Sequence, residues 1–476
     1  MNRILSHRAL AVAVLAAAAA GCDNGLTELN VNPNEPVEVG AEYLFPNATE
    51  AAVSRVLGQS IHMDITALWV QQYAESRYSE EDRYEITDSK VDGQWGGFYA
   101  GPLQDFNEVI AKGQETDRPN LRAMGTVMQS WTFQAVTDLW GDIGYSDALR
   151  GRDPDAGLEV KLDPQEQVYA GLLTSLRSAA EMIDPAGPTI ESADLIYQGE
   201  MEKWRKFANS LRMRVSMRLS EVDPSTAASG FQAAYQAGGF TSNDDNALLR
   251  YVDNNVDVNP LYAYQSNRDD HAVSATMVDT LTKLNDPRLA IYARQNAGGD
   301  YKGMPNGDMS SFSLDSISRI GTYFSAADAP GVVMSYAEVL FLEAEAAERG
   351  WIAADPAALY EQGIAAAMEM YGVSQSDIDA YLAQARVQYQ GGDAGLHQIW
   401  LQKWIALFGN GPEAYAEWRR TGYPVLVAGP DAINGGKIPV RLPYPASEEA
   451  LNRANVAEAV SRQGGATLND PVWWDK

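Results

Sequence analysis

Apolar residues recur along most of this sequence at spacings of three and four positions, the period of an amphipathic helix. In ten segments the apolar stripe is continuous enough to predict a helix. These segments span residues 47–77, 95–112, 120–140, 165–183, 200–220, 275–284, 335–349, 356–371, 376–389 and 397–408. No stretch shows the regular alternation expected of a main sheet. The pattern predicts a mainly α protein, with β structure limited to short hairpins in the connections.

Long polar connections separate these helices. They are rich in Gly, Asn, Asp and Pro, and the longest cover residues 141–164, 240–274 and 296–330. Loops of this length in a compact protein usually carry function, so an irregular, loop-rich part is expected to hold any binding site. Residues 22–46, rich in Asn, Pro, Glu and Val, are expected to form an extended tether ahead of a single domain over 47–476.

Two neighbouring helices show the features of a tetratricopeptide-type hairpin. Asp355 and Pro356 suit the N-cap and the first position of the second helix. No strict repeat of about 34 residues is present, so degenerate hairpins in a superhelical scaffold are predicted. Small side chains stand where the two helices could approach closely, at Ala344, Ala346, Ala347, Ala365 and Ala366.

Residues 1–21 are typical of a lipoprotein signal peptide. A basic start precedes an apolar run from Ala9 to Ala20, which is shorter than the roughly 20 residues of a membrane-spanning helix. The end of the run resembles a lipobox, with Ala19 where leucine is commonest, then Gly21 and Cys22. Cys22 is the single cysteine, so it has no disulfide partner within the chain. We predict that it is acylated, for example with palmitate; the alternative is a plain secretory signal with an incidental cysteine.

Charge narrows the range of partners. After cleavage the chain would carry 34 basic and 64 acidic side chains, a net charge of −30. Such a protein repels nucleic acid and anionic surfaces, so lipid is the expected means of membrane attachment. Carboxylate pairs are too numerous for spacing to single out a glycosidase pair, and the acidic side chains are expected to form a solvated face.

The sequence lacks the usual catalytic signatures. The mature part has only His62, His271 and His397, without a His-Glu-x-x-His motif, and contains no Gly-x-Ser-x-Gly, Walker or dinucleotide fingerprint. Residues 253–259 begin like a calcium loop, but Val258 and Tyr264 occupy the glycine and glutamate positions. No enzyme activity, cofactor or metal is therefore predicted.

Long motifs carry the strongest signal. They are LTELNVNPNEPVEV (26–39), LWGDIGYSDAL (139–149), KFANSLRMRVSMRLS (206–220), MSYAEVLFLEAEAAERGW (334–351), EAYAEWRRTGYPVL (413–426) and IPVRLPYPASEEALNRANV (438–456). Together they resemble the SusD/RagB family of nutrient-binding outer-membrane lipoproteins, in particular its SusD-like subgroup. The resemblance covers nearly the whole chain and departs at Gly144, where proline is usual.

The resemblance implies a scaffold of tetratricopeptide-like hairpins held by lipid at the outer membrane, on the cell surface. The implied protein is not an enzyme. It binds a nutrient oligomer, either a glycan or a peptide, and delivers it to a SusC-like TonB-dependent β-barrel transporter. Two alternatives are a helical-repeat scaffold that binds only protein and a lipid-anchored glycosidase.

Aromatic side chains in polar sequence are the best candidates for ligand contacts, because rings stack on the apolar faces of sugars and on peptide side chains. In the family that the sequence resembles, the Trp-Tyr-Asn spacing near residue 95 lies close to the ligand face. This favours Trp95 and Tyr99; the alternative for Trp95 is a packing role at the start of a helix. The full set of candidates is Trp95, Tyr99, Asp92, Asn107, Tyr78 and Tyr84.

Overall fold

The computed structural model describes residues 39–151, 153, 155–157, 159–254, 257–310 and 312–475. The predicted signal peptide, Cys22 and most of the predicted tether lie outside these residues, as does Asn255 in the calcium-like segment. Among the described helices, none has the length and apolar character needed to cross a membrane.

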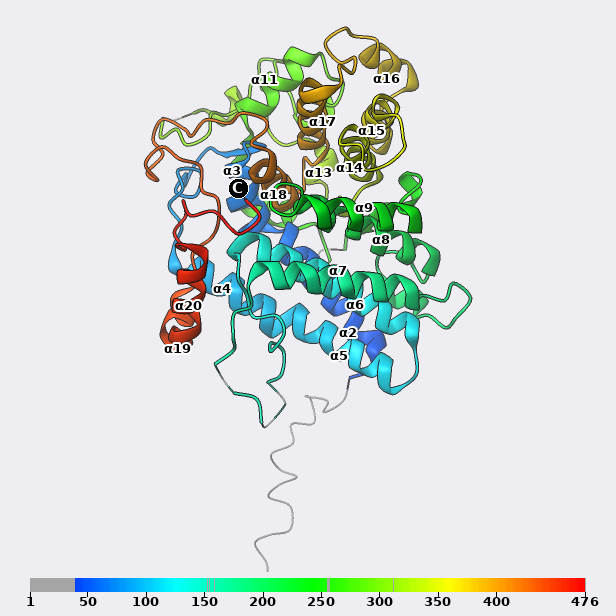
Figure 1. Cartoon of the computed structure of the whole chain (residues 1–476). Coiled ribbons are helices and arrows are strands. Elements are labelled where there is room, and N and C mark those ends of the chain that lie inside the picture. The colour runs from blue at the N-terminus through cyan, green and yellow to red at the C-terminus, as the bar shows by residue number, and fades with distance from the viewer. Residues whose placement is uncertain are drawn as a thin grey trace, which may run out of the picture.

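Successive helices stack side by side in the first half of the chain (Figure 1). They are α2 (Ala41–Leu57), α5 (Gln104–Glu115), α6 (Pro119–Trp140), α7 (Gln165–Met182), α8 (Met201–Arg218) and α9 (Pro224–Ala237). From α5 to α9, each helix packs on the next in sequence, and α2 packs on α5. This is the hairpin stacking of a tetratricopeptide-like scaffold and confirms the predicted fold class.

A second group of helices follows in the C-terminal half. It contains α14 (Tyr336–Glu348), α15 (Pro356–Met370), α16 (Gln375–Leu382), α17 (Gly392–Ala406) and α18 (Gly411–Thr421). The predicted hairpin is α14–α15, and Asp355 caps α15 by accepting a hydrogen bond from the Ala357 amide at 3.0 Å. The helices approach so closely that a Cβ on Gly363 would lie 2.8 Å from the Phe341 ring. Ala344 and Ala366 are buried between them, as predicted.

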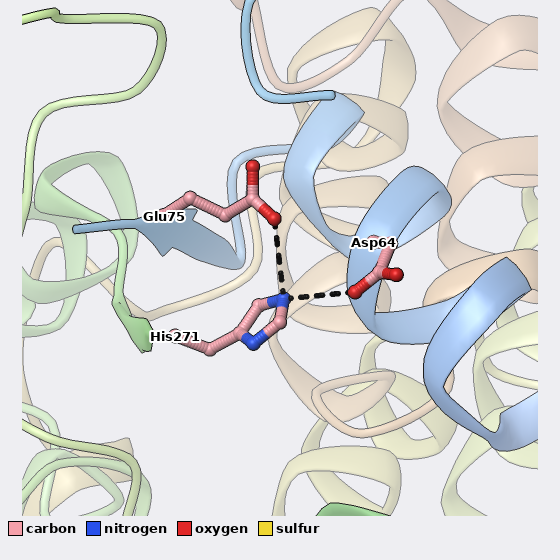
Figure 2. A group of neighbouring side chains, drawn as sticks. All are labelled: Asp64, Glu75 and His271. Carbon is pink, nitrogen blue, oxygen red and sulfur yellow. Dashed lines mark ion pairs between the residues drawn. The ribbon is translucent and has the colours of Figure 1, made fainter. Parts of the chain in front are cut away.

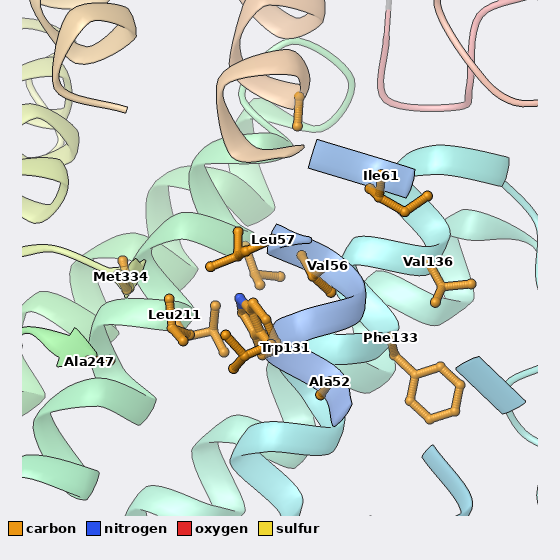
Figure 3. Close-up of a cluster of buried hydrophobic side chains, with 14 of the residues drawn as sticks. Ala52, Val56, Leu57, Ile61, Trp131, Phe133, Val136, Leu211, Ala247 and Met334 are labelled. Atoms are coloured by element: carbon orange, nitrogen blue, oxygen red, sulfur yellow. The ribbon is translucent and has the colours of Figure 1, made fainter. Parts of the chain in front are cut away.

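The main hydrophobic core lies where α2 meets α6 and α8. Val56 and Leu57 of α2, Trp131 of α6 and Leu211 of α8 belong to one buried cluster (Figure 3). The cluster continues to Met334 in the C-terminal half, so the two groups of helices share one core.

In the described residues, the strands form two small antiparallel sheets, β1 (Tyr73–Glu75) with β3 (His271–Val273) and β2 (Ala247–Leu249) with β4 (Gly331–Met334). The prediction of local hairpins was wrong, because both pairings join segments far apart in sequence. Each strand is too short to form a stable hairpin alone, and both sheets are held by the helices around them.

Two predicted helices are divided. Within 47–77, α2 ends at Leu57 and is followed by a π-helix, η1 (Gln59–Thr66), then α3 (Ala67–Trp69) and β1. Within 95–112 lie the end of α4 (Asp88–Phe98), η2 (Tyr99–Leu103) and most of α5. The break falls at Gly101, whose φ of −113° and ψ of −114° are not helical, just before Pro102, which lacks an amide hydrogen.

The other predicted helices are present, most of them within two residues of the expected limits; α16 ends early at Leu382, and α17 begins early at Gly392. Helices that the pattern did not predict are α9, α18, α19 (Ala446–Leu451) and α20 (Arg453–Gln463). Helix α11 (Ala275–Leu284) lies at its predicted place. Short elements fill the connections: η3 (Glu191–Ala193), η4 (Asn243–Asp245), α10 (Pro260–Asn267), α12 (Leu289–Tyr292), η5 (Leu314–Ser316) and α13 (Thr322–Ser325).

A network of buried ion pairs joins α8, α14, α17 and α18. Four pairs link different helices: Arg214–Glu338 at 2.6 Å, Arg218–Glu413 at 2.7 Å, Lys403–Glu417 at 3.1 Å and Arg420–Glu345 at 2.6 Å. All eight side chains are almost fully buried. The expectation that acidic residues form a solvated face was therefore wrong for these four glutamates, because each has a buried cationic partner on a neighbouring helix.

Candidate functional site

The segment that follows α3 has an unusual backbone. Gln71, Tyr78 and Tyr84 all have positive φ, at 55°, 55° and 73°. Non-glycine residues seldom adopt this left-handed conformation, and such positions cluster at binding sites. The segment contributes two of the predicted aromatic residues, and the structure places them in different surroundings.

A polar cavity of about 340 Å³, here called the Tyr78 cavity, opens beside this segment. Its walls come from η1, β1, the start of α4 and α10. The lining residues are Gln59, Ser60, Asp64, Glu75, Tyr78, Glu80, Glu81, Glu85, Thr87, Lys90, Tyr264 and Arg268. Five carboxylates face two cationic side chains, so the cavity favours a neutral or cationic ligand over an anionic one.

Two tyrosines and an arginine form one wall of the Tyr78 cavity. The Tyr78 side chain is 65% exposed, and the Arg268 guanidinium lies 4.3 Å from its ring centre and 5.9 Å from that of Tyr264. Asp270 fixes the group by accepting hydrogen bonds from Arg268 at 2.8 Å and from the Tyr264 hydroxyl at 3.2 Å. Tyr78 therefore presents an open ring beside a positioned hydrogen-bond donor.

Asp64 and Glu75, which line this cavity, also lie next to the buried side chain of His271 (Figure 2). Pairing of β1 with β3 places Glu75 directly opposite His271, and η1 supplies Asp64. Burial alone would raise the pKa of Asp64, but His271 and Lys90 outweigh it and the net shift is downward. Burial raises the pKa of Glu75 well above its usual value, and neighbouring carboxylates add to this shift.

A second cavity, of about 380 Å³ and here called the Trp95 cavity, lies between α4, the 141–164 connection and α19. Most of its lining is apolar. The lining residues are Trp95, Gly96, Tyr99, Ala100, Gln104, Gly144, Ala148, Leu149, Val160, Leu162, Ser447 and Glu448. The two aromatic residues favoured by sequence therefore do share one site.

Trp95 lines this cavity mainly as part of the core. Its side chain is 5% exposed, and its ring centre lies 5.4 Å from that of Trp140, 5.2 Å from Tyr99 and 6.0 Å from Tyr444. The indole N–H donates to Glu448 Oε1 at 3.2 Å. With only 5% of its surface exposed and its donor engaged, Trp95 offers a ligand little free surface.

The remaining predicted residues support the walls or lie elsewhere. Asp92 accepts hydrogen bonds from the backbone and hydroxyl of Ser447 at 3.2 and 2.9 Å, near the start of α19. Asn107 donates to the Leu149 carbonyl at 3.4 Å. Tyr84 is 2% exposed and packs edge-on against Trp69. Neither polar residue lines the Trp95 cavity, and Tyr84 is a core residue.

The partners of Tyr78 were not predicted from the sequence. Tyr264 and Arg268 come from the 240–274 connection, which was correctly identified as long but was given no helix. A local signal was present, since Asn259 caps α10 by accepting from the Leu261 amide at 2.8 Å, with Pro260 at the first helical position. Asp64, Glu75 and His271 share no local motif, because their proximity depends on the pairing of β1 with β3.

A tetratricopeptide-like scaffold with cavities bordered by loops defines a helical ligand-binding protein. The chain belongs to the SusD-like family, described as starch-binding and associating with the outer membrane, whose profile matches residues 33–445. This confirms the resemblance found in the sequence. Members of the family are binding proteins of the outer membrane.

Similar solved structures support the assignment to this family. A chitin-binding protein is similar at 30% identity and a TM-score of 0.81, over 92% of this chain and 100% of that chain. A chitin-binding SusD homologue from Flavobacterium johnsoniae is 27% identical, with a TM-score of 0.80 over 92% and 98%. A SusD homologue from Bacteroides uniformis is 26% identical, with a TM-score of 0.81 over 91% and 99%. No curated protein matches the sequence.

Proposed function

We propose that this protein binds an oligosaccharide at the cell surface and delivers it to a SusC-like TonB-dependent β-barrel transporter, with Cys22 as its lipid anchor. Support for a glycan comes from the family's starch-binding description and from two similar chitin-binding proteins. The observation that carries the proposal is the open Tyr78 ring beside hydrogen-bonding groups in a cavity of suitable size.

The Tyr78 cavity matches the chemistry of a sugar. An aromatic ring can cover the apolar face of a pyranose, while charged groups at the rim bind its hydroxyls. Arg268 and Lys90 supply donors and the carboxylates supply acceptors. The volume of 340 Å³ lies within the range of small-molecule sites. Because the cavity has more carboxylates than cations, it favours a neutral or cationic oligosaccharide over an anionic one.

Calorimetric titration with starch- and chitin-derived oligosaccharides, and with neutral peptides, tests the proposal. Tyr78→Ala should weaken binding by about 2 kcal/mol or more, roughly thirtyfold, because an anchoring aromatic is lost. Tyr78→Phe keeps the ring and should bind nearly as the parent does. Tyr43, 69% exposed on α2, provides a matched control, since Tyr43→Ala removes an exposed ring elsewhere. Unchanged affinity in Tyr78→Ala would place the ligand elsewhere, and binding of peptides alone would change the ligand class.

The Trp95 cavity is a second candidate position for the ligand, favoured by its size and by two predicted aromatic residues. Gly144 lines it, and a Cβ there would lie 3.1 Å from Val160 and 3.8 Å from the Tyr99 hydroxyl. Gly144→Ala should therefore narrow the cavity. If Gly144→Ala binds the oligosaccharide more weakly and Tyr78→Ala binds it as the parent does, the ligand site is the Trp95 cavity.

Two experiments address delivery and catalysis. The protein should copurify in mild detergent with a large β-barrel, through an interface of at least roughly 2,000 Å² as in permanent assemblies. Recovery of a free monomer while the barrel is expressed would favour the scaffold alternative or a solitary binding protein. Release of shorter sugars from a bound oligosaccharide would favour the glycosidase alternative.

A further inference from the structure

The completely buried side chain of His271 has no hydrogen bond of good geometry to any described residue. Its side chain is 0% exposed, and neither ring nitrogen makes a hydrogen bond with the part of the chain that the structure describes. Nε2 points to two carboxylates, lying 3.3 Å from Asp64 Oδ1 and 3.7 Å from Glu75 Oε1 (Figure 2). Asp64 Oδ1 is also buried and, among the described residues, has no hydrogen bond of good geometry. Buried polar atoms are seldom left in this state.

The separations match those between ligands of one metal ion. Zn²⁺ binds imidazole nitrogen and carboxylate oxygen at roughly 2.0–2.2 Å, so neighbouring ligands of a tetrahedral site stand roughly 3.3–3.6 Å apart. The two distances from His271 Nε2 lie close to this range. One potential ligand atom from each of the three residues lies within 4.8 Å of the others.

The surroundings hold the three side chains in place. Lys90 Nζ binds Asp64 Oδ2 at 3.0 Å, which leaves Oδ1 free to face His271. Glu75 Oε2 accepts a hydrogen bond from the Asp82 amide at 3.4 Å, which leaves Oε1 on the side of the imidazole. Such outer contacts orient the ligands of metal sites. Asp64 and Glu75 also line the Tyr78 cavity, which gives an ion access from solvent.

We propose that Asp64, Glu75 and His271 form a binding site for a divalent transition metal, with Zn²⁺ as the best match, whose open coordination position faces the Tyr78 cavity. A mixed set of imidazole and carboxylate ligands suits a first-row metal better than Ca²⁺ or Mg²⁺, which prefer oxygen alone. The π-helix η1 fits this assignment, since such helices recur at functional sites. The site does not depend on which ligand the cavity takes.

Metal analysis of the full-length protein, produced without a polyhistidine tag, tests the site. After chelator treatment, the protein is dialysed against buffered Zn²⁺ and the bound metal is measured. We expect about one Zn²⁺ per chain. His271→Gln and Asp64→Asn should each weaken binding by more than the roughly 10–100-fold caused by outer-shell changes. Glu80→Gln is the matched control, because Glu80 lines the same cavity outside the cluster, and it should bind as the parent does.

Two results would overturn the assignment. Absence of Zn²⁺ from the folded parent would mean that His271 forms only an internal ion pair with the two carboxylates. Retention of Zn²⁺ by His271→Gln would mean that the metal lies at another place on the chain. If the variants fail to fold, X-ray absorption of the Zn²⁺-loaded parent decides: imidazole and oxygen scatterers at roughly 2.0–2.2 Å support the site, and a shell without imidazole refutes it.

Discussion

Arg420 is the residue whose loss should most disturb the buried ion-pair network. Its guanidinium donates to both oxygens of Glu345, at 2.7 and 2.6 Å, to Ser220 at 2.9 Å, and to Glu417. Arg420→Met keeps an unbranched apolar stem in place of the arginine stem but lacks the guanidinium. The substitution therefore removes the charge and its hydrogen bonds with a smaller loss of packing than Arg420→Ala would cause.

The expected loss is about 3–5 kcal/mol of unfolding free energy, the cost of removing one partner from a buried ion pair. Glu345 would keep Arg349 at 2.9 Å and the Trp400 indole at 2.9 Å, and Glu417 would keep Lys403 at 3.1 Å. These remaining contacts place the loss towards the lower end of the range. Arg349→Met removes a partly exposed partner of the same glutamate and should cost about 1 kcal/mol or less.

Urea denaturation followed by circular dichroism measures the unfolding free energy of the parent and both variants. The comparison holds if the slope of the transition is unchanged. In the parent, Arg420 and its neighbours hold the pKa values of Glu345 and Glu417 below normal despite burial. Carboxylates with lowered pKa stabilise the fold above their unfolded pKa, and this contribution is lost as the pH falls. Without Arg420 the two carboxylates protonate more readily, so the variant should approach the parent in stability between pH 7 and about pH 4.

A loss below about 1 kcal/mol for Arg420→Met at pH 7 would refute the reasoning, because it is the value of an exposed pair. Equal losses for Arg420→Met and Arg349→Met would do the same, since burial is the difference between the two. A gap that widens towards pH 4 would contradict the assigned ionisation of the glutamates.

Three further predictions concern Trp95, Glu343 of α14 and Cys22. Trp95→Ala should lower the unfolding free energy by about 3–5 kcal/mol; an unchanged melting temperature with lost oligosaccharide binding would instead make Trp95 a ligand contact. Burial raises the pKa of Glu343 from 4.5 to about 7, so the stability of the parent falls as the pH rises between these values. Glu343→Gln should therefore have a higher melting temperature than the parent at pH 8 but not at pH 4. In cells without the barrel, Cys22→Ser should move the protein from the membrane to the soluble fraction. If the variant stays in the membrane fraction, the lipid is not the sole anchor.

The fold was largely predictable because it rests on local periodicity. Most helix positions followed from apolar spacing, and the α14–α15 hairpin from Asp355, Pro356 and small residues. What escaped prediction depends on distant partners. Arg214 and Glu338 each look like solvent-facing charges within their own helices, and only the packing of α8 against α14 shows that they are buried together.

The candidate site was less predictable for the same reason. Trp95 lies in polar, glycine-containing sequence, yet Trp140 and Tyr444 enclose its ring. Tyr78 has similar local sequence and is exposed. Local composition could not separate these two cases, because the neighbours that decide them come from other parts of the chain.

The pairing of β1 with β3 has a consequence for the order of folding. Glu75 and His271 are opposite each other although about 200 residues separate them along the chain, and contacts of such long range carry a high loop-closure cost and slow folding. The stack from α5 to α9 can gain contacts between neighbouring helices before this loop closes. A chain cut after α9 would keep that stack but lack Tyr264, Arg268 and His271. Acquisition of ligand binding would therefore report completion of the fold rather than formation of the helices.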